Sequence, residues 1–374
     1  MSDLSDADRI LHSDEPVQRR PEPAPTVDGD KAPTPPGRSS KQGGLLRWGI
    51  LTIILVLGAL YGVGLWWSLQ PDKFDVEENA RRILDKQTSP VPGATIVASA
   101  IRVGETLLEK PGGYLRNDVT PPGILMDNMP AWEYGLLTEL RDSVRAMRND
   151  FSRSQTQSVE NLDLKDADSK FSFDDTSWIL PSSEDEYRKG LAALQRFLKD
   201  LVAGNPQARF YARGDNLRAY LMVVEKRLGS FGQRLSASVG DEELMAALGG
   251  LGAAAMPEVA EGDPEFQGSG PSERTHWSEI DDIFFEARGY AWALLHMMKA
   301  ISVDFEELLG QKNAQVSMQQ IIRDLEYATM FKWSPMVLNG HGFGALANHS
   351  LVLASYMSRA NAAVLDLRVL LERG

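Results

Sequence analysis

The sequence has no cysteine among its 374 residues. Disulfide bonds, thiolate metal sites and cysteine nucleophiles are therefore excluded. Histidine is scarce as well: there are five, and one of them, His12, lies near the N-terminus. Any chemistry that depends on histidine would have to use the other four.

An excess of positive charge is also missing. The formal net charge is −13, and residues 1–47 hold seven basic and eight acidic side chains, so almost all of the negative charge falls on the remainder. Contacts from Lys and Arg to phosphate supply most of the affinity for nucleic acids. An acidic chain without a basic stripe therefore argues against nucleic acid as a partner.

A third absence is that of strand patterns. Beyond Pro71 no segment alternates apolar and polar residues as a half-buried strand does, whereas apolar residues recur at helical spacing, as between Leu191 and Leu201. We predict an all-α protein in which an N-terminal transmembrane helix is followed by a large antiparallel helical bundle-like domain.

One long apolar segment is present. No charged residue occurs from Trp48 to Gln70, and a helix of that length rises roughly 34 Å, enough for a hydrocarbon core of about 30 Å. Trp48 and Trp66–Trp67 lie where interfacial aromatic belts are found. Buried core helices rarely lack polar residues for so long, and Ser68–Pro71 offers no cleavage site typical of a signal peptide. We predict a transmembrane anchor at residues 47–70.

The rest of the chain divides on either side of this anchor. Residues 1–46 are rich in Pro, Ser, Asp and Gly, which predicts a disordered tail, and residues 72–374 are predicted to form the helical domain. A glycine-rich, acidic stretch at about 238–275 is predicted to be a flexible insertion. Basic residues just before the anchor (Arg38, Lys41 and Arg47) favour a cytoplasmic tail and a periplasmic domain at the inner membrane.

Within the anchor, Gly58 and Gly62 have the GxxxG spacing that lets two membrane helices approach closely. Glycine is common in such helices, so the spacing also arises by chance. We expect the lipid bilayer, envelope proteins and further copies of the chain as partners.

The sequence also predicts particular helix boundaries. A long helix is expected over Ala131–Arg153, with charged residues such as Glu139 on a solvated outer face. Ser183 and Glu186 have the spacing of a capping box at the start of another helix. The last helix is expected over Ala345–Leu371.

The first group of polar residues that could form a site lies on one predicted helix. Helical spacing aligns Asp282, Glu286, Gly289, Ala293 and His296 in a single stripe. Two carboxylates and a histidine on one stripe suit a metal ion or an acid–base pair. In the structural alternative, which we favour, the two small residues admit a neighbouring helix and the polar groups pair with arginines such as Arg288.

A second group lies around the start of the last helix. Glycines at residues 340, 342 and 344 resemble an anion-binding loop, but no strand precedes them and no lysine follows, and a tight turn explains them equally well. The polar residues of this group are Asn339, His341, Asn348, His349 and Asn361. Glu273 and His276 have the spacing of a di-iron motif, which would need a second copy. We therefore expect no catalytic residue, metal or cofactor.

Several segments are familiar when taken together: Arg213-Gly-Asp-Asn-Leu217, Leu228-Gly-Ser230, Asp281-Asp282 through Phe285-Glu-Ala-Arg-Gly289, Ser334-Pro-Met-Val-Leu-Asn-Gly340, and Ala347-Asn-His-Ser-Leu351 with Ser358-Arg-Ala-Asn-Ala362. With these segments the chain resembles an uncharacterised proteobacterial family of single-pass inner-membrane proteins, a domain of unknown function. The resemblance covers about residues 75–374. It implies a Gram-negative source and an inner-membrane location, and it brings no activity with it.

Two hypotheses of function follow. The first, which we favour, is a structural or protein-interaction role in the cell envelope. The second is a membrane-tethered enzyme or ligand-binding domain that uses the stripe around Glu286 and His296 together with His341 and His349. The second hypothesis requires these side chains and Asp282 to converge on one accessible pocket.

Overall fold

The computed structural model describes residues 41–84, 91–154, 160–239, 275–334, 336–340 and 345–373. All regular structure in these ranges is helical, apart from one isolated β-bridge between Asn339 and Asn348. The predicted all-α fold is thus confirmed. Most of the predicted tail and nearly all of the predicted 238–275 insertion lie outside the described residues.

The chain divides after residue 53 into a smaller and a larger compact unit, and this boundary falls within the first helix, α1 (Lys41–Trp67). Arg47–Trp67 is long and apolar enough to cross a membrane, with a mean hydropathy of 2.1, and none of it is buried. This confirms an apolar N-terminal helix, which is compatible with one membrane span and equally with a signal sequence. The Gly58 and Gly62 face is open, because a Cβ added at either position would have no neighbour within 4 Å.

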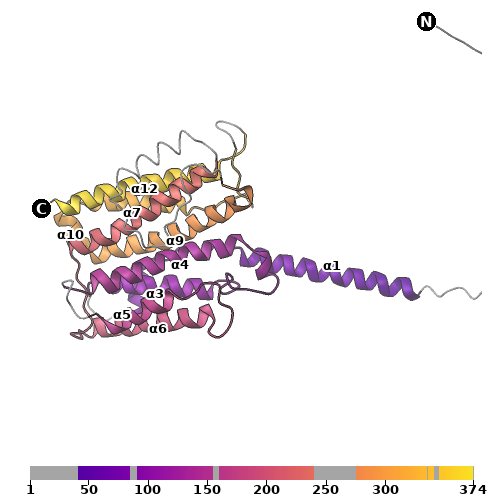
Figure 1. The fold of residues 1–374 in the computed structure, drawn as a ribbon, viewed down its shortest axis with the longest axis horizontal. Coiled ribbons are helices and arrows are strands. Elements are labelled where there is room, and N and C mark those ends of the chain that lie inside the picture. Colours follow the sequence, from indigo (N-terminus) through magenta and orange to yellow (C-terminus); the bar gives the residue numbers. More distant parts are fainter. Residues whose placement is uncertain are drawn as a thin grey trace, which may run out of the picture. The chain divides into compact units, whose positions relative to one another are not determined.

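The larger unit is built from ten α-helices among the described residues (Figure 1). They are α2 (Val76–Ile83), α3 (Ala94–Glu109), α4 (Asn128–Ala146), α5 (Leu162–Phe171), α6 (Ser183–Val202), α7 (Gly214–Ala237), α9 (Ile280–Asp304), α10 (Glu306–Gln311), α11 (Gln315–Ala328) and α12 (His349–Glu372). Short 3₁₀ turns at Gly123–Leu125 and Trp277–Glu279 precede α4 and α9, and a π-helical turn, Met147–Phe151, extends α4.

Helices α5 and α6 pack together as antiparallel neighbours, and so do α11 and α12. The most extensive contact joins α4 and α9, which are far apart in sequence. These two run in the same direction: Asp127 and Asp282 at their starts line one cavity, and Phe151 and Phe305 beyond their ends have ring centroids 5.6 Å apart. Each lies among other helices, and α9 is buried over most of its length.

Two predicted helix starts are shifted by side-chain capping. The residue that caps α6 is Ser182, whose hydroxyl accepts the Asp185 N–H, so the predicted capping box at Ser183 is wrong by one position. The Ser183 hydroxyl instead bonds carbonyl oxygens of the preceding loop. Likewise α12 begins at His349 and not at Ala345, because Asn348 accepts the Leu351 N–H at 2.9 Å.

Helix α5 has no counterpart in the sequence-based prediction. It is short, and although its buried side chains Leu164, Ala167, Asp168 and Phe171 have helical spacing, only three of them are apolar. Asn161 caps it by accepting the Leu164 N–H at 3.0 Å. Its position comes from packing against α6 and α4.

Helices α4 and α9 touch through their backbones at two glycines. A Cβ added to Gly135 would lie 1.9 Å from the carbonyl oxygen of Glu286, and one added to Gly289 would lie 1.9 Å from that of Trp132. No side chain fits at either position. This confirms the prediction that Gly289 admits a neighbouring helix.

Gly289→Ala or Gly135→Ala should therefore force α4 and α9 apart and lower the free energy of unfolding by about 1–3 kcal/mol or more. Gly229→Ala in α7 is the matched control: its Cβ would meet Asn361 Nδ2 at an ordinary 3.7 Å. Alanine favours a helix over glycine by about 1 kcal/mol, so the control should be neutral or stabilising.

Denaturant unfolding of the full chain in detergent micelles would compare the three variants. If Gly289→Ala is as stable as Gly229→Ala, the two backbones do not make this contact.

Candidate functional site

A cavity on which charged groups converge lies where α4 and α9 begin. Its volume is about 360 Å³. It is lined by Arg116, Asp127, Pro130, Ala131, Tyr134, Asp282 and Glu286. Two members of the predicted stripe thus face one cavity, together with residues that the sequence did not single out.

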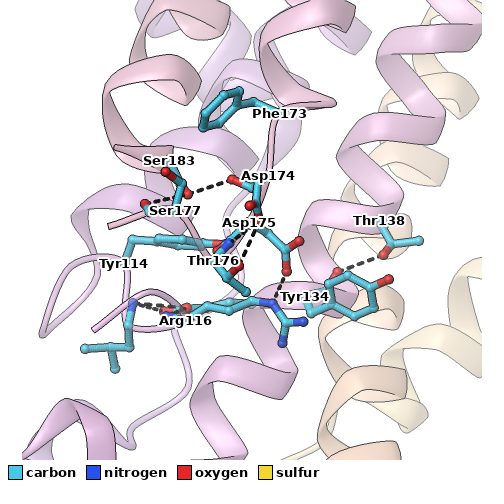
Figure 2. A network of polar contacts seen from close by, with 12 residues as sticks. Tyr114, Arg116, Tyr134, Thr138, Phe173, Asp174, Asp175, Thr176, Ser177 and Ser183 are labelled. Atoms are coloured by element: carbon cyan, nitrogen blue, oxygen red, sulfur yellow. Dashed lines mark hydrogen bonds and ion pairs between the residues drawn. The ribbon is translucent and has the colours of Figure 1, made fainter. Parts of the chain in front are cut away.

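Most of the charges around this cavity already have partners. Arg116 pairs with Asp175 and lies 4.3 Å from the centre of the Tyr134 ring (Figure 2). Glu286 accepts two N–H groups of Arg234 on α7, one of them at 2.9 Å. Glu286 thus pairs with an arginine, as the structural alternative predicted, but the partner is Arg234 from another helix and not Arg288.

Two aspartates remain at the cavity. Asp127 accepts the Asn128 N–H at 2.7 Å and so caps α4. Burial raises the pKa of Asp282 above its ordinary value, and the neighbouring carboxylates, first Asp127 and then Asp281, raise it further. Acid–base chemistry or a ligand cation at this position would depend on Asp282.

Two loops hold Arg116 in place (Figure 2). The Tyr114 hydroxyl donates to the carbonyl of Asp175 at 2.9 Å, which joins the segment after α3 to the segment between α5 and α6. Beneath them, Glu133 on α4 is fully buried and accepts the N–H groups of Leu115 (2.9 Å) and Arg116 (2.8 Å). No sequence spacing relates these residues, so only the fold could reveal them.

Glu133 also forms an ion pair with Lys110, and both side chains are almost fully buried. The Lys110 ammonium donates in addition to the carbonyl of Gly113. Together these contacts anchor the loop after α3 to α4.

His296, the last member of the predicted stripe, lies in the core and away from the cavity lining. Its Nδ1 lies 2.7 Å from the carbonyl of Trp292, its Nε2 accepts the Phe74 N–H at 3.1 Å, and its ring stacks on Phe74 at 4.0 Å. Burial lowers its pKa to about 3. The imidazole is therefore neutral with both nitrogens in use, so it is not available as an acid or base.

In the part of the chain that the structure describes, Arg288 has three hydrogen-bond partners, and none is a carboxylate. The guanidinium donates to Gln70 Oε1 (2.9 Å) and to the carbonyls of Ala328 (3.0 Å) and Met330 (2.7 Å). Burial lowers its pKa to about 10. Arg288 thus joins the residues after α1 to the end of α11.

The polar residues near α12 mostly form a turn. Asn339 Oδ1 accepts the Ser350 N–H at 3.1 Å, Asn348 caps the helix, and His349 Nδ1 accepts the Leu338 N–H at 2.9 Å. Burial lowers the pKa of His349, and the positive charges of Lys332 and Arg288 lower it further.

The other two residues of that group stand apart from this turn. His341 lies outside the described residues, so its predicted role stays a prediction. On α12, the buried Asn361 Oδ1 has no hydrogen-bond partner among the described residues.

One residue predicted to be solvated is instead fully buried. Glu139 on α4 has no exposed surface, and its Oε1 accepts the hydroxyls of Ser143 (2.7 Å) and Tyr220 on α7. Burial raises its pKa to about 8, and the nearby carboxylate of Asp142 contributes. The prediction failed because α7 covers this side of α4, which the spacing of charges along one helix cannot show.

Comparison with known families and structures adds one relation. A family model described as "Uncharacterized protein conserved in bacteria (DUF2333)" matches residues 40–374. No curated protein and no solved structure matches the chain. Within the described ranges, no group of three or more His, Asp or Glu side chains is placed to hold a metal ion.

His296→Ala and Glu286→Ala should each lower the free energy of unfolding by about 1–3 kcal/mol, because the Phe74 N–H or the Arg234 guanidinium loses its partner. Glu109→Ala, at an exposed position of α3, is the control and should change stability by less than about 0.5 kcal/mol. Thermal unfolding of the full chain would be measured beside complementation of a deletion strain. Unchanged stability with lost complementation would instead make these groups functional.

Glu139 gives a pH-dependent prediction. Its carboxyl ionises near pH 4.5 in the unfolded chain and near pH 8 in the folded protein, so the folded state holds the extra proton between these values. Stability should therefore fall as pH rises through this window. Glu139→Gln keeps an acceptor for Tyr220, cannot ionise, and should be the more stable form at about pH 8 and above.

Thermal unfolding of both proteins across this range isolates Glu139, since other titrating groups are common to the two. If the unfolding temperatures of the wild type and of Glu139→Gln change with pH in the same way, this carboxyl is already ionised in the folded protein.

Proposed function

The chain belongs to the bacterial family DUF2333, and from its helical fold and its apolar first helix we propose that it is a membrane-anchored helical domain with a structural or protein-interaction role in the cell envelope. In this proposal α1 spans the inner membrane once. Residues 1–46 are then cytoplasmic and residues 72–374 periplasmic, as the basic residues before the uncharged segment of α1 favour. The family's own description gives no activity.

One observation supports this proposal most: the residues directly after α1 are bonded into the helical domain. Gln70 accepts from Arg288, Lys73 donates to the carbonyl of Glu326 at 3.2 Å, and the Phe74 N–H donates to His296. The exposed apolar helix is therefore continuous with the folded domain, with no unbonded linker between Trp67 and the domain.

The alternative is a tethered enzyme or ligand-binding domain that uses the stripe around Glu286 and His296. Asp282 and Glu286 do face a cavity with Tyr134, and their negative charge beside an aromatic ring suits a ligand amine. His296 and His349, however, are occupied with backbone N–H groups elsewhere. Among the described residues the carboxylates of the stripe and the histidines therefore do not share one pocket, which favours the structural role.

The proposed topology is tested by reporters fused after Gly374. Alkaline phosphatase, which folds only in the periplasm, should be active there, and a fluorescent protein that folds only in the cytoplasm should be dark. Fusions after Arg47 should give the opposite pair of results. Reversed activities would place the domain in the cytoplasm, and a full-length product released by alkaline carbonate would show that α1 is no anchor.

A further inference from the structure

Exposed apolar side chains gather on the loop that follows α11. Met330, Phe331, Trp333 and Met336 are all exposed, and Trp333 has 91% of its surface accessible. An aromatic residue this open to water is uncommon, since Trp and Phe side chains bury large apolar areas when a partner surface is available. The loop therefore presents an unpartnered apolar surface.

This loop lies beside the exit of α1. The Arg288 guanidinium bonds Gln70 and the carbonyl of Met330 at the same time, and Lys73 bonds Glu326 in the last turns of α11. Gln70 follows Trp67, the last residue of α1, by three positions. The donor and the acceptor of each of these bonds lie in the larger compact unit.

A second exposed apolar loop, the one before α4, also lies beside α1. Val119, Ile124 and Leu125 are exposed, Leu125 by 80%. A Cβ on Gly64 in α1 would touch Pro122 of this loop at 3.7 Å. The two loops thus approach the last turns of the same helix.

A third loop, between α5 and α6, exposes Trp178, Ile179 and Leu180, the last by 90%. It is tied to the segment after α3 by Asn117, which donates to the carbonyl of Ser177 at 2.8 Å, and by the Arg116–Asp175 pair. It therefore lies at the same end of the domain as the first two loops. By contrast Val316, in the first turn of α11, is exposed singly about 20 Å along the helix from Met330.

The charges at this end suit the headgroup layer of a bilayer. Within the described ranges the ammonium groups of Lys73 and Lys332 donate to backbone carbonyl oxygens, and Lys332 lies 5.7 Å from the Phe285 ring. Carboxylates such as Asp118 and Asp127 are also present, so apolar contact and not charge must supply most of the attraction. Membrane–water interfaces of proteins typically have Trp and other aromatic side chains together with Lys at the end of an apolar helix, and this end of the domain has the same composition.

We infer that these three apolar loops insert into the interfacial layer of the bilayer that α1 spans, so that one end of the domain rests on the membrane surface. The inference depends on the proposed anchoring by α1. A patch of several exposed apolar segments marks an interaction surface. Continuity with α1 makes lipid the occupant, because anchoring already holds these loops at the depth of the headgroups, where apolar side chains bury by about 5–10 Å.

The absence of cysteine allows a direct test, since any introduced cysteine can be labelled alone. Trp333→Cys, Leu125→Cys and Leu180→Cys in the full chain would carry an environment-sensitive fluorophore, with Val316→Cys as the exposed control at the other end of α11. The proteins would be reconstituted into vesicles of phosphatidylethanolamine and phosphatidylglycerol. A lipid with a doxyl quencher near its headgroup should reduce the emission of the three loop labels and leave the control unchanged.

A label at Leu57→Cys, within α1, separates this inference from the proposed anchoring. Quenching at 57 by a doxyl group deep in the acyl chain, without quenching in the loops, would leave the anchor in place and overturn the inference. Loop labels shielded from aqueous iodide but insensitive to the lipid quencher would also overturn it, because a protein would then occupy the surface. No quenching at 57 would remove the anchor, and the inference with it.

Discussion

The backbones of α4 and α9 meet at Gly135 and Gly289, where an added Cβ would lie 1.9 Å from a carbonyl oxygen of the facing helix. Such proximity sets the positions of the groups on either side. It brings the rings of Trp132 and Trp292 to 5.6 Å, and it aligns the two helix starts so that Asp127 and Asp282 line one cavity. A larger residue at either glycine would displace the cavity and the aromatic pair together.

Ionisable groups buried around this contact mainly hold loops and helix ends. Glu133 binds two backbone N–H groups of the loop after α3, and His296 binds the N–H of Phe74 after α1. Burying such groups is costly unless they are hydrogen-bonded, which explains why each has partners in segments that cannot satisfy their own backbone groups. The buried polar groups thus hold the loops between helices in place, and they also join the helices to one another.

Sequence reasoning identified most of the helices, though not α5, as well as the apolar first helix and the small residue at Gly289. These features leave periodic or compositional signals within one segment. Sequence reasoning missed the partners of Glu286 and His296, because Arg234 and Phe74 lie far away in sequence and no spacing connects them. The prediction that Glu139 is solvated failed for a related reason. Periodicity shows which face of a helix carries charge, but it does not show which faces other helices cover. In the same way, Arg116 and Asp127 reach the cavity only because distant helices align.

Two charged side chains of α9, Arg288 and Asp304, are accommodated by helix ends and not by ion pairs among the described residues. Near the start of α9, Arg288 donates to the carbonyls of Ala328 and Met330 at the C-terminal end of α11, where the helix dipole is negative. At its other end, Asp304 accepts the Ile96 N–H at 2.8 Å at the start of α3, where the dipole is positive. Burial still raises the pKa of Asp304 to about 6, so the helix end offsets only part of the cost of desolvation. Helix α9 therefore places a charge of opposite sign at one end of each of two other helices, α11 and α3. Through Arg288 it also binds Gln70, so the junction with α1 depends on the same central helix that packs against α4.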